Sequence, residues 1–181
     1  MSGTAGDDAY DRLRRRVLWL LSTGLYVVGS RATIGEAATR WNLMTANLVV
    51  QVCLEPKLVA VAVEAGSVTR SLVAASGAFT VSLLGRHDRA VVRRFVKPVV
   101  EVELGPDGQP QMMSGVAVHP TPLGPPVLEG AAAWIACEVR EQLVLGSHVL
   151  FVGEVADVDG PPPGDTVEPL RMEDTRMNYG G

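Results

Sequence analysis

A strand-like apolar run leads directly into a segment rich in hydroxyl groups, and this segment is the first candidate site. LVAVAV at 58–63 is followed by EAGSVTRS at 64–71, which predicts a turn and then a helix with Ser67 as its N-cap. Free backbone N–H groups at a helix start, together with the helix dipole, make a site for an anion such as a phosphate. Arg70 stands where a capping box would have Glu or Gln, and a cation there is favourable only near an anion. An ordinary serine cap with a solvated arginine is the alternative interpretation.

A second candidate lies just before another apolar strand, at NLMTAN (42–47). Its small and polar side chains would let a flat ring approach backbone donors and acceptors closely. A polar loop before a strand is the alternative, and these residues alone favour that alternative.

The sequence lacks the motifs of several nucleotide-dependent and hydrolytic sites. It contains no GxGxxG that opens a helix after a strand, no Walker GxxxxGK[ST], no GxSxG and no HExxH. His87, His119 and His148 share no ligand spacing with each other or with a cysteine, so no metal site is predicted. No pair of carboxylates stands out as an acid–base couple. An enzyme of this sequence is therefore expected to rely on a bound cofactor for its chemistry.

The composition predicts one globular domain. The chain has 181 residues, of which 47% are hydrophobic and 20% charged, and its formal net charge is −4. At about 150 residues per domain, this length allows one domain with a long loop or tail. No nucleic-acid partner is expected, because such a partner would require a basic stripe that replaces counterions. Cys53 and Cys137 do not form a disulfide framework, and two reduced thiols fit a cytoplasmic protein.

The N-terminal segment carries arginines followed by VLWLL, which resembles the start of a signal peptide. Against that interpretation, Asp7, Asp8 and Asp11 interrupt the cationic lead, and apolar residues recur from Tyr10 at helical spacing. We therefore predict an amphipathic first helix. No apolar run approaches the roughly 20 residues that a membrane span needs, so no membrane association is expected.

The elements that must position the candidate sites are mostly strands. Strand residues and alternation predict strands at 24–30, 46–53, 58–63, 79–84, 132–144 and 148–158. Between them we expect a polar hairpin region at 31–42, short helices at 67–76 and 86–95, and a functional flap or covering hairpin at 97–131. The basic run of Arg89, Arg93 and Arg94 with Lys97 is interpreted as a solvated helix face, and a role in partner docking or in binding a phosphate of NAD is the alternative.

Strands with only short helices between them do not build a parallel α/β sheet. A small closed antiparallel barrel removes exposed strand edges and is the natural alternative. The predicted fold class is therefore all-β, a barrel with short helices.

Two long stretches resemble a known family. NLMTANLVVQVCLEPKLVAVAVEAGSVTRSLVAASGAFTVSLL is similar to the flavin reductase-like, FMN-binding split-barrel family, whose members show N-G-M-T-A-[NS], S-[VF]-x-[PL]-P, [ST]-x-T-x-x-L and S-G-x-F-x-[VI]-N-[IV]-L. PPVLEGAAAWIACEVREQLVLGSHVLFVGEV resembles the family's P-V-L-x-x-A-x-A-W-L-x-C-x-V and G-D-H-x-L-F-[VI]-G-E-V. The resemblance covers residues 23–158, and the final Tyr179-Gly180-Gly181 fits it as well.

The resemblance implies a homodimeric split β-barrel of Greek-key type that binds FMN or FAD near the dimer interface. It divides the chain into an N-terminal helix and arm at 1–22, the flavin reductase-like domain at 23–160 and a tail at 161–181. In this family the nicotinamide lies against the flavin ring, which accounts for the missing dinucleotide fingerprint.

The activity that the resemblance implies is an NAD(P)H-dependent flavin oxidoreductase. Hydride would pass from NADH or NADPH to FMN or FAD, and the reduced flavin would go to a partner monooxygenase. A flavin-binding protein or subunit without reductase turnover is the alternative.

The resemblance also assigns roles to individual residues. By this resemblance, the isoalloxazine ring and the ribityl chain would be lined by Met44, Thr45, Ala46 and Asn47. Backbone contacts to the flavin would come from Gln51, Val52 and Cys53. Phosphate binding is carried over to Ser67 and Thr69, in agreement with the helix-start argument, and a ribityl or phosphate contact to Ser82. The catalytic residue is His148, at the nicotinamide side of the flavin. A structural histidine that shares a strand face with Leu150 and Val152 is the alternative for His148.

Several positions depart from the family pattern. Leu43 replaces a small residue and would crowd the ring, and Cys53 stands where serine is common. Ser82 replaces an asparagine, and Ser147 replaces the aspartate before His148, which removes a carboxylate that could orient the imidazole. These departures motivate the alternative of binding without turnover.

Overall fold

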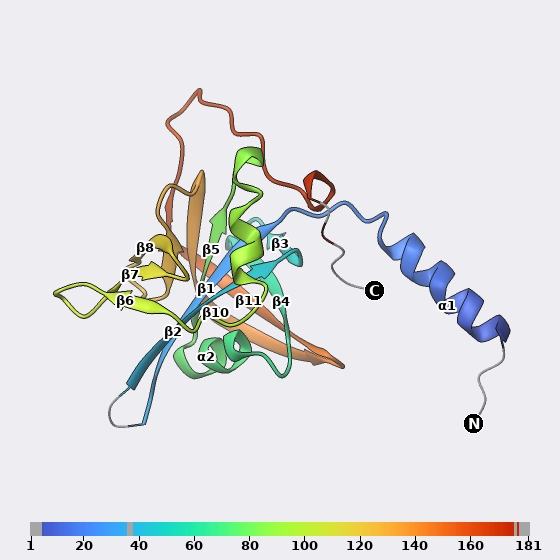
Figure 1. Ribbon diagram of the computed structural model, residues 1–181, viewed down its shortest axis with the longest axis horizontal. Helices are drawn as coiled ribbons and strands as arrows, with labels where there is room; N and C mark the ends of the chain where they lie inside the picture. The colour runs from blue at the N-terminus through green and yellow to red at the C-terminus, as the bar shows by residue number, and fades with distance from the viewer. Residues whose placement is uncertain (1–4, 36–37, 176, 178–181) are drawn as a thin grey trace.

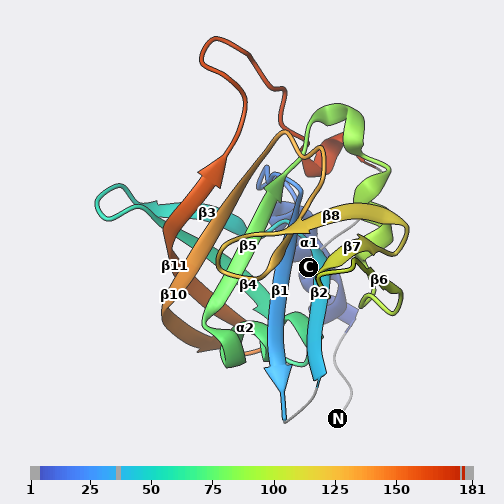
Figure 2. The same cartoon turned by 90° about the vertical axis from the view of Figure 1, so that its left-hand side faces the viewer.

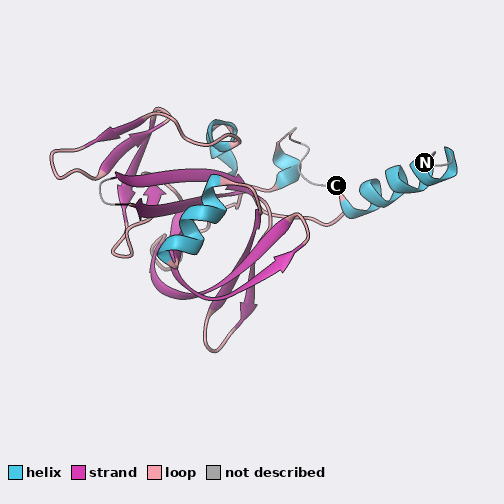
Figure 3. Ribbon diagram, turned by 90° about the horizontal axis from the view of Figure 1, so that it is seen from below, coloured by secondary structure: helices cyan, strands magenta, loops and turns pink. Residues whose placement is uncertain are grey.

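The computed structural model of the chain describes residues 5–35, 38–175 and 177. The final Tyr179-Gly180-Gly181 lies outside the described residues. Nine elements build the body and the N-terminal extension: α1 (Ala5–Leu18), β1 (Tyr26–Ile34), β2 (Ala38–Ala46), β3 (Val49–Cys53), β4 (Leu58–Glu64), α2 (Val68–Ser76), β5 (Ala78–Leu83), β10 (Ala133–Leu145) and β11 (His148–Asp159). Strands dominate, which confirms the predicted all-β class with short helices (Figure 3).

Seven of the strands form one antiparallel sheet. Their order is β2-β1-β5-β10-β11-β4-β3, and the long strands lie side by side in Figure 2. The sheet is strongly curved. Helix α2 contacts β1 and β2, which lie at one edge of the sheet, and also β4, which lies near the opposite edge. This arrangement brings the end of β2, the start of α2 and the start of β11 toward one region of the molecule.

Helix α2 follows the sequence prediction closely. Ser67 is its N-cap, and the Ser67 hydroxyl oxygen accepts a hydrogen bond from the Arg70 backbone N–H at 3.1 Å. Gly77 ends the helix with φ at 70°, a left-handed conformation that glycine adopts without steric cost. The predicted strands over 58–63 and 148–158 are likewise confirmed by β4 and β11.

The hairpin predicted at 31–42 is confirmed, because the end of β1 pairs antiparallel with the start of β2, and the hydroxyl oxygens of Thr33 and Thr39 lie 3.1 Å apart across it. Two other predictions for the connecting segments are wrong. The segment 86–95 forms two 3₁₀ turns, η1 (Arg86–Asp88) and η2 (Val91–Phe95), instead of one helix.

The second correction concerns the segment at 97–131, which does not fold as a flap. It forms a four-stranded sheet of β6 (Val102–Leu104), β7 (Pro110–Met113), β8 (Val116–Pro120) and β9 (Pro126–Leu128). Strand β9 is anchored on β5, where the Thr80 hydroxyl donates to the Pro126 carbonyl at 2.6 Å. Prolines are tolerated in such short strands because the edges need few ladder bonds.

Two apolar clusters stabilise these layers. One fills the curve of the large sheet around Phe79 and Phe151, both fully buried. The other packs Leu43 and Phe95 between β2, η2 and the small sheet. Because burying each such side chain contributes about 1.5–3 kcal/mol, the two clusters hold β2 and the turn after it in a defined position.

The predicted first helix is confirmed as α1, which extends away from the body of the molecule (Figure 1). None of the helices in the described part of the chain is long and apolar enough to span a membrane. The boundaries between arm, domain and tail at residues 22 and 160 stay predictions.

Candidate functional site

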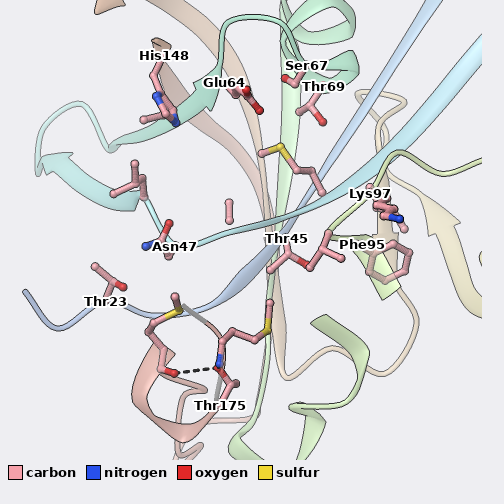
Figure 4. A pocket seen from close by; sticks show the side chains of 18 of the residues that line it. Thr23, Thr45, Asn47, Glu64, Ser67, Thr69, Phe95, Lys97, His148 and Thr175 are labelled. Carbon is pink, nitrogen blue, oxygen red and sulfur yellow. Dashed lines mark hydrogen bonds between the residues drawn. The ribbon is translucent and has the colours of Figure 1, made fainter. Parts of the chain in front are cut away.

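A cavity of about 960 Å³ lies where the end of β2, the start of α2 and the start of β11 meet. Figure 4 shows Thr45 and Asn47 of the β2 end, Ser67 and Thr69 of the helix start, and His148 around it. Its volume is in the range of pockets that hold nucleotide-sized ligands, which is roughly 300–1,000 Å³. Elements that are far apart in sequence therefore build one pocket.

The end of β2 supplies the wall of the pocket. Met44, Thr45, Ala46 and Asn47 all line it. Thr45 is buried, and its hydroxyl donates to the Val92 carbonyl at the start of η2. Because that hydroxyl is bonded inside the protein, Thr45 holds the end of β2 against η2.

The start of α2 supplies hydrogen-bond donors. The Ser67 oxygen already accepts from the backbone N–H of Arg70, so the hydrogen of its hydroxyl is available to a ligand. Gly66, Val68 and Thr69 line the pocket beside it. The first backbone N–H groups of a helix have no intrahelical partners, and together with the dipole they favour an anion.

His148 lines the pocket from the first position of β11. Its ring nitrogen Nδ1 lies 2.9 Å from the hydroxyl oxygen of Ser147, so the imidazole is held by its neighbour in the chain. The residue is half-buried, while Val149 and Phe151 on the other face of the strand are buried in the sheet cluster. His148 therefore presents its ring to the pocket.

The remaining lining combines an apolar surface with a few charges. Ala62, Val68 and Phe95 add apolar area, and the charged side chains are Glu64, Lys97 and Glu173. This lining suits a ligand with a flat apolar ring and an anionic tail. The ring would lie against the wall formed by the end of β2, and the tail would lie at the start of α2. Within the described ranges, no group of three or more His, Cys, Asp or Glu side chains could hold a metal ion.

Comparison with known proteins places this arrangement in a family. The family described as "Flavin reductase like domain" matches residues 18–180, nearly the whole chain. The chain belongs to this family. Its fold is accordingly the split barrel that the structural relatives share.

Three relatives illustrate the similarity. An NADH-dependent flavin reductase of Pseudomonas fluorescens is 29% identical over 156 residues, which is 86% of this chain and 82% of the relative. The styrene monooxygenase flavin reductase of Pseudomonas putida has 28% identity and a TM-score of 0.66, covering 90% of this chain and 93% of its own. An NADH:FAD oxidoreductase of Streptomyces globisporus has 26% identity and a TM-score of 0.71, covering 100% of this chain and 98% of its own.

The pocket brings together seven of the residues that the family resemblance assigned. They are Met44, Thr45, Ala46, Asn47, Ser67, Thr69 and His148. Gln51, Val52 and Cys53 lie on β3 and do not line the pocket. Ser82 is fully buried in β5, and its hydroxyl oxygen accepts from the Leu128 N–H at 3.0 Å, so it joins β5 to β9 instead of lining the pocket.

Sequence reasoning missed the two chain ends and the segment after η2. The pocket is also lined by the arm, at Leu18, Trp19, Leu21, Ser22 and Thr23, and by the tail, at Met172, Glu173, Thr175 and Met177. The two segments are joined where the Met172 N–H donates to the Thr23 carbonyl at 2.9 Å. Lys97 is exposed, as the sequence predicted for this basic run, and it also lines the pocket. No local signal marks these segments, since only the tertiary fold brings them to the site.

Two departures from the family pattern have structural explanations. Leu43 is fully buried and belongs to the apolar cluster beneath β2, and it also lines the pocket from that cluster. Ser147 replaces an aspartate but still provides an oxygen to the His148 ring.

Proposed function

We propose that this chain is an NAD(P)H-dependent flavin reductase whose pocket binds FMN or FAD. The observation that carries the proposal is that one pocket joins the Met44–Asn47 wall, the Ser67–Thr69 helix start and His148, in a chain of the flavin reductase like family. NADH is the favoured hydride donor, because relatives named for their donor use NADH.

In this proposal the isoalloxazine ring lies along the Met44–Asn47 wall, and the phosphate lies at Ser67 and Thr69. Small side chains such as Ala46 and Ala62 let a flat ring approach the backbone of the strands. The hydroxyl of Ser67 and the N–H groups of the first helical turn donate to the phosphate.

Bound flavin supplies a ring that accepts a hydride from the nicotinamide. The protein supplies orientation and excludes water, which are the contributions expected of a protein that binds a redox cofactor. His148, held by Ser147, provides a hydrogen-bonding group at the open side of the ring and orients the nicotinamide there.

We further propose that the functional unit is a homodimer. Strand β3 is an edge of the large sheet, and the alternate residues Leu48, Val50 and Val52 and the following Leu54 expose apolar side chains. An exposed apolar edge strand is a typical site of protein association. Leu48 also lines the pocket, so the apolar edge reaches the site itself.

The reduced flavin is proposed to serve a flavin-dependent monooxygenase, as the name of the styrene monooxygenase relative suggests. A cytoplasmic location is part of the proposal, supported by the free thiols of Cys53 and Cys137.

The activity is tested by mixing the purified protein with NADH or NADPH and then adding FMN, FAD or riboflavin. We expect loss of NADH absorbance that requires both the protein and an added or co-purified flavin. No NADH or NADPH oxidation with any flavin, from a protein that binds flavin, would favour a binding module instead.

A further inference from the structure

Asn42 connects two segments of the pocket through a buried side chain. It lies on β2 with only 2% of its surface exposed and lines the pocket. Its amide Nδ2 donates to the Thr69 hydroxyl oxygen at 2.9 Å, and its Oδ1 accepts from the Val99 backbone N–H at 2.9 Å. The amide orientation is determined, because a backbone N–H can only donate. Asn42 therefore fixes the helix start and the segment after η2 relative to each other.

The first consequence concerns the hydroxyl of Thr69. A hydroxyl has one hydrogen to donate, and the Thr69 oxygen already accepts from Asn42. Thr69 is 1% exposed, and its hydroxyl donates to no other group in the described part of the chain. The hydrogen is thus left for an acceptor that enters the pocket.

The second consequence concerns the position of Lys97, which belongs to the segment that Asn42 holds. Lys97 stands two residues before Val99, its side chain is exposed, and it lines the same pocket as Thr69; Figure 4 draws it beside Phe95. None of the ion pairs within 4.0 Å among the described residues involves Lys97. The other charged or titratable lining groups are Glu64, Glu173 and His148, so Lys97 is the permanent cation of the described lining.

We propose that Lys97 binds the phosphate of the flavin nucleotide, and that Asn42 is the positioning residue that holds Lys97 and the Thr69 hydroxyl toward that phosphate. This inference rests on the proposed flavin site and adds to it a positive charge that balances the negative charge of the phosphate. A lysine near a phosphate acts as a point charge and strengthens the neutral donors around it. The flavin phosphate is favoured over a phosphate of the nicotinamide nucleotide, because Asn42 ties the Lys97 segment to Thr69.

The test compares FMN with riboflavin, which has the same ring and no phosphate. Dissociation constants are measured by fluorescence titration for the natural protein and for Lys97→Met. We expect FMN to bind about tenfold more weakly to the variant, with riboflavin affinity unchanged. Lys97→Arg should restore most of the FMN affinity. Arg93→Met is the matched control, because Arg93 is an exposed cation on the preceding turn that does not line the pocket.

Asn42→Asp tests the positioning role with a side chain of the same shape. An aspartate still accepts from Val99 but cannot donate to Thr69, so the Thr69 hydroxyl would turn its hydrogen toward the aspartate. We expect the preference for FMN over riboflavin to fall about tenfold or more. If this buried substitution prevents folding, the Lys97 variants and the salt dependence of FMN binding decide the question.

The outcomes separate the inference from the proposed function. Equal losses for FMN and riboflavin in Lys97→Met, or no loss for either, would overturn the inference while leaving the flavin site in place. A raised KM for NADH with unchanged FMN affinity would also overturn it, by assigning Lys97 to the nicotinamide nucleotide. Absence of flavin binding to the natural protein would instead reject the proposed function.

Discussion

Glu64 on β4 and His148 on β11 occupy directly opposed positions in the antiparallel sheet. The next pair along, Ala65 and Ser147, is joined by a backbone hydrogen bond of 2.9 Å. Because hydrogen-bonded and non-hydrogen-bonded pairs alternate, Glu64 and His148 form a non-hydrogen-bonded pair, in which side chains come closer together. Both side chains line the pocket, so the strand register places a carboxylate beside the proposed catalytic imidazole.

Replacing His148 should impair turnover more than binding. In His148→Asn we expect kcat/KM for NADH to fall about tenfold or more, because an interaction with the nicotinamide is lost. The dissociation constant for FMN should stay within about twofold, since the ring and phosphate contacts lie elsewhere. Steady-state kinetics and fluorescence titration measure the two quantities.

His119→Asn is the matched control for this prediction. His119 contacts Glu129 at 2.8 Å and lies outside the pocket lining. Full turnover in His148→Asn, or an equal effect of both substitutions, would assign His148 a structural role.

Replacing Ser67 should weaken phosphate binding specifically. Ser67→Ala removes a donor to the proposed phosphate, and a hydrogen bond to a charged group contributes roughly 1.5–3 kcal/mol. It also removes the N-cap of α2, which costs about 1 kcal/mol of stability. We expect the free energy of FMN binding to weaken by roughly 1.5–3 kcal/mol, the contribution of the lost hydrogen bond. The affinity for riboflavin should be unchanged.

Ser71→Ala serves as the control for Ser67→Ala, because Ser71 is an exposed serine of the same helix turn that does not line the pocket. Urea unfolding of each variant separates the capping effect from the binding effect. If Ser67→Ala binds FMN as tightly as the natural protein does, the phosphate lies at another place.

The apolar edge at β3 should control the oligomeric state. Val50 is 59% exposed, and Val50→Asp would place a charge in the proposed dimer interface. We expect a shift from dimer to monomer in light scattering after size-exclusion chromatography. Val100→Asp is the control, because Val100 is equally apolar, fully open to solvent and outside β3. A natural protein that is monomeric at all concentrations would contradict the dimer proposal.

The two cysteines should differ in reactivity. Cys137 is fully buried, and desolvation raises the pKa of its thiol to about 12. A raised pKa keeps the thiol protonated from about pH 7 to about pH 10, so the reactive thiolate is scarce across that interval. Cys53 is half-buried on the edge strand. A thiol reagent should therefore titrate one cysteine in the folded protein and the second only after unfolding; fast reaction of both would show that Cys137 is accessible.

Local signals explain the parts of the fold that sequence predicted well. The cap at Ser67 and the glycine at position 77 define α2 without reference to any distant residue. The same holds for β4, a short apolar run rich in valine, in which Val61 and Val63 are buried. The hairpin at 31–42 was predicted in spite of its polar residues, since the pairing of two strands with each other does not require apolar side chains.

The site was predicted only in part, for a related reason. Motif matching identified the wall and the helix start, whereas Lys97 and the two chain ends reach the pocket through tertiary contacts. Ser82 shows the opposite error. It occupies a motif position, but its hydroxyl is used between β5 and β9.

The most direct measurement is the structure of the protein crystallised with FMN. The proposed function predicts one FMN molecule in the pocket, with its ring against Met44–Asn47 and its phosphate within hydrogen-bond distance of Ser67 and Thr69. An FMN bound at another surface, or one whose ring and phosphate do not reach both segments, would contradict it.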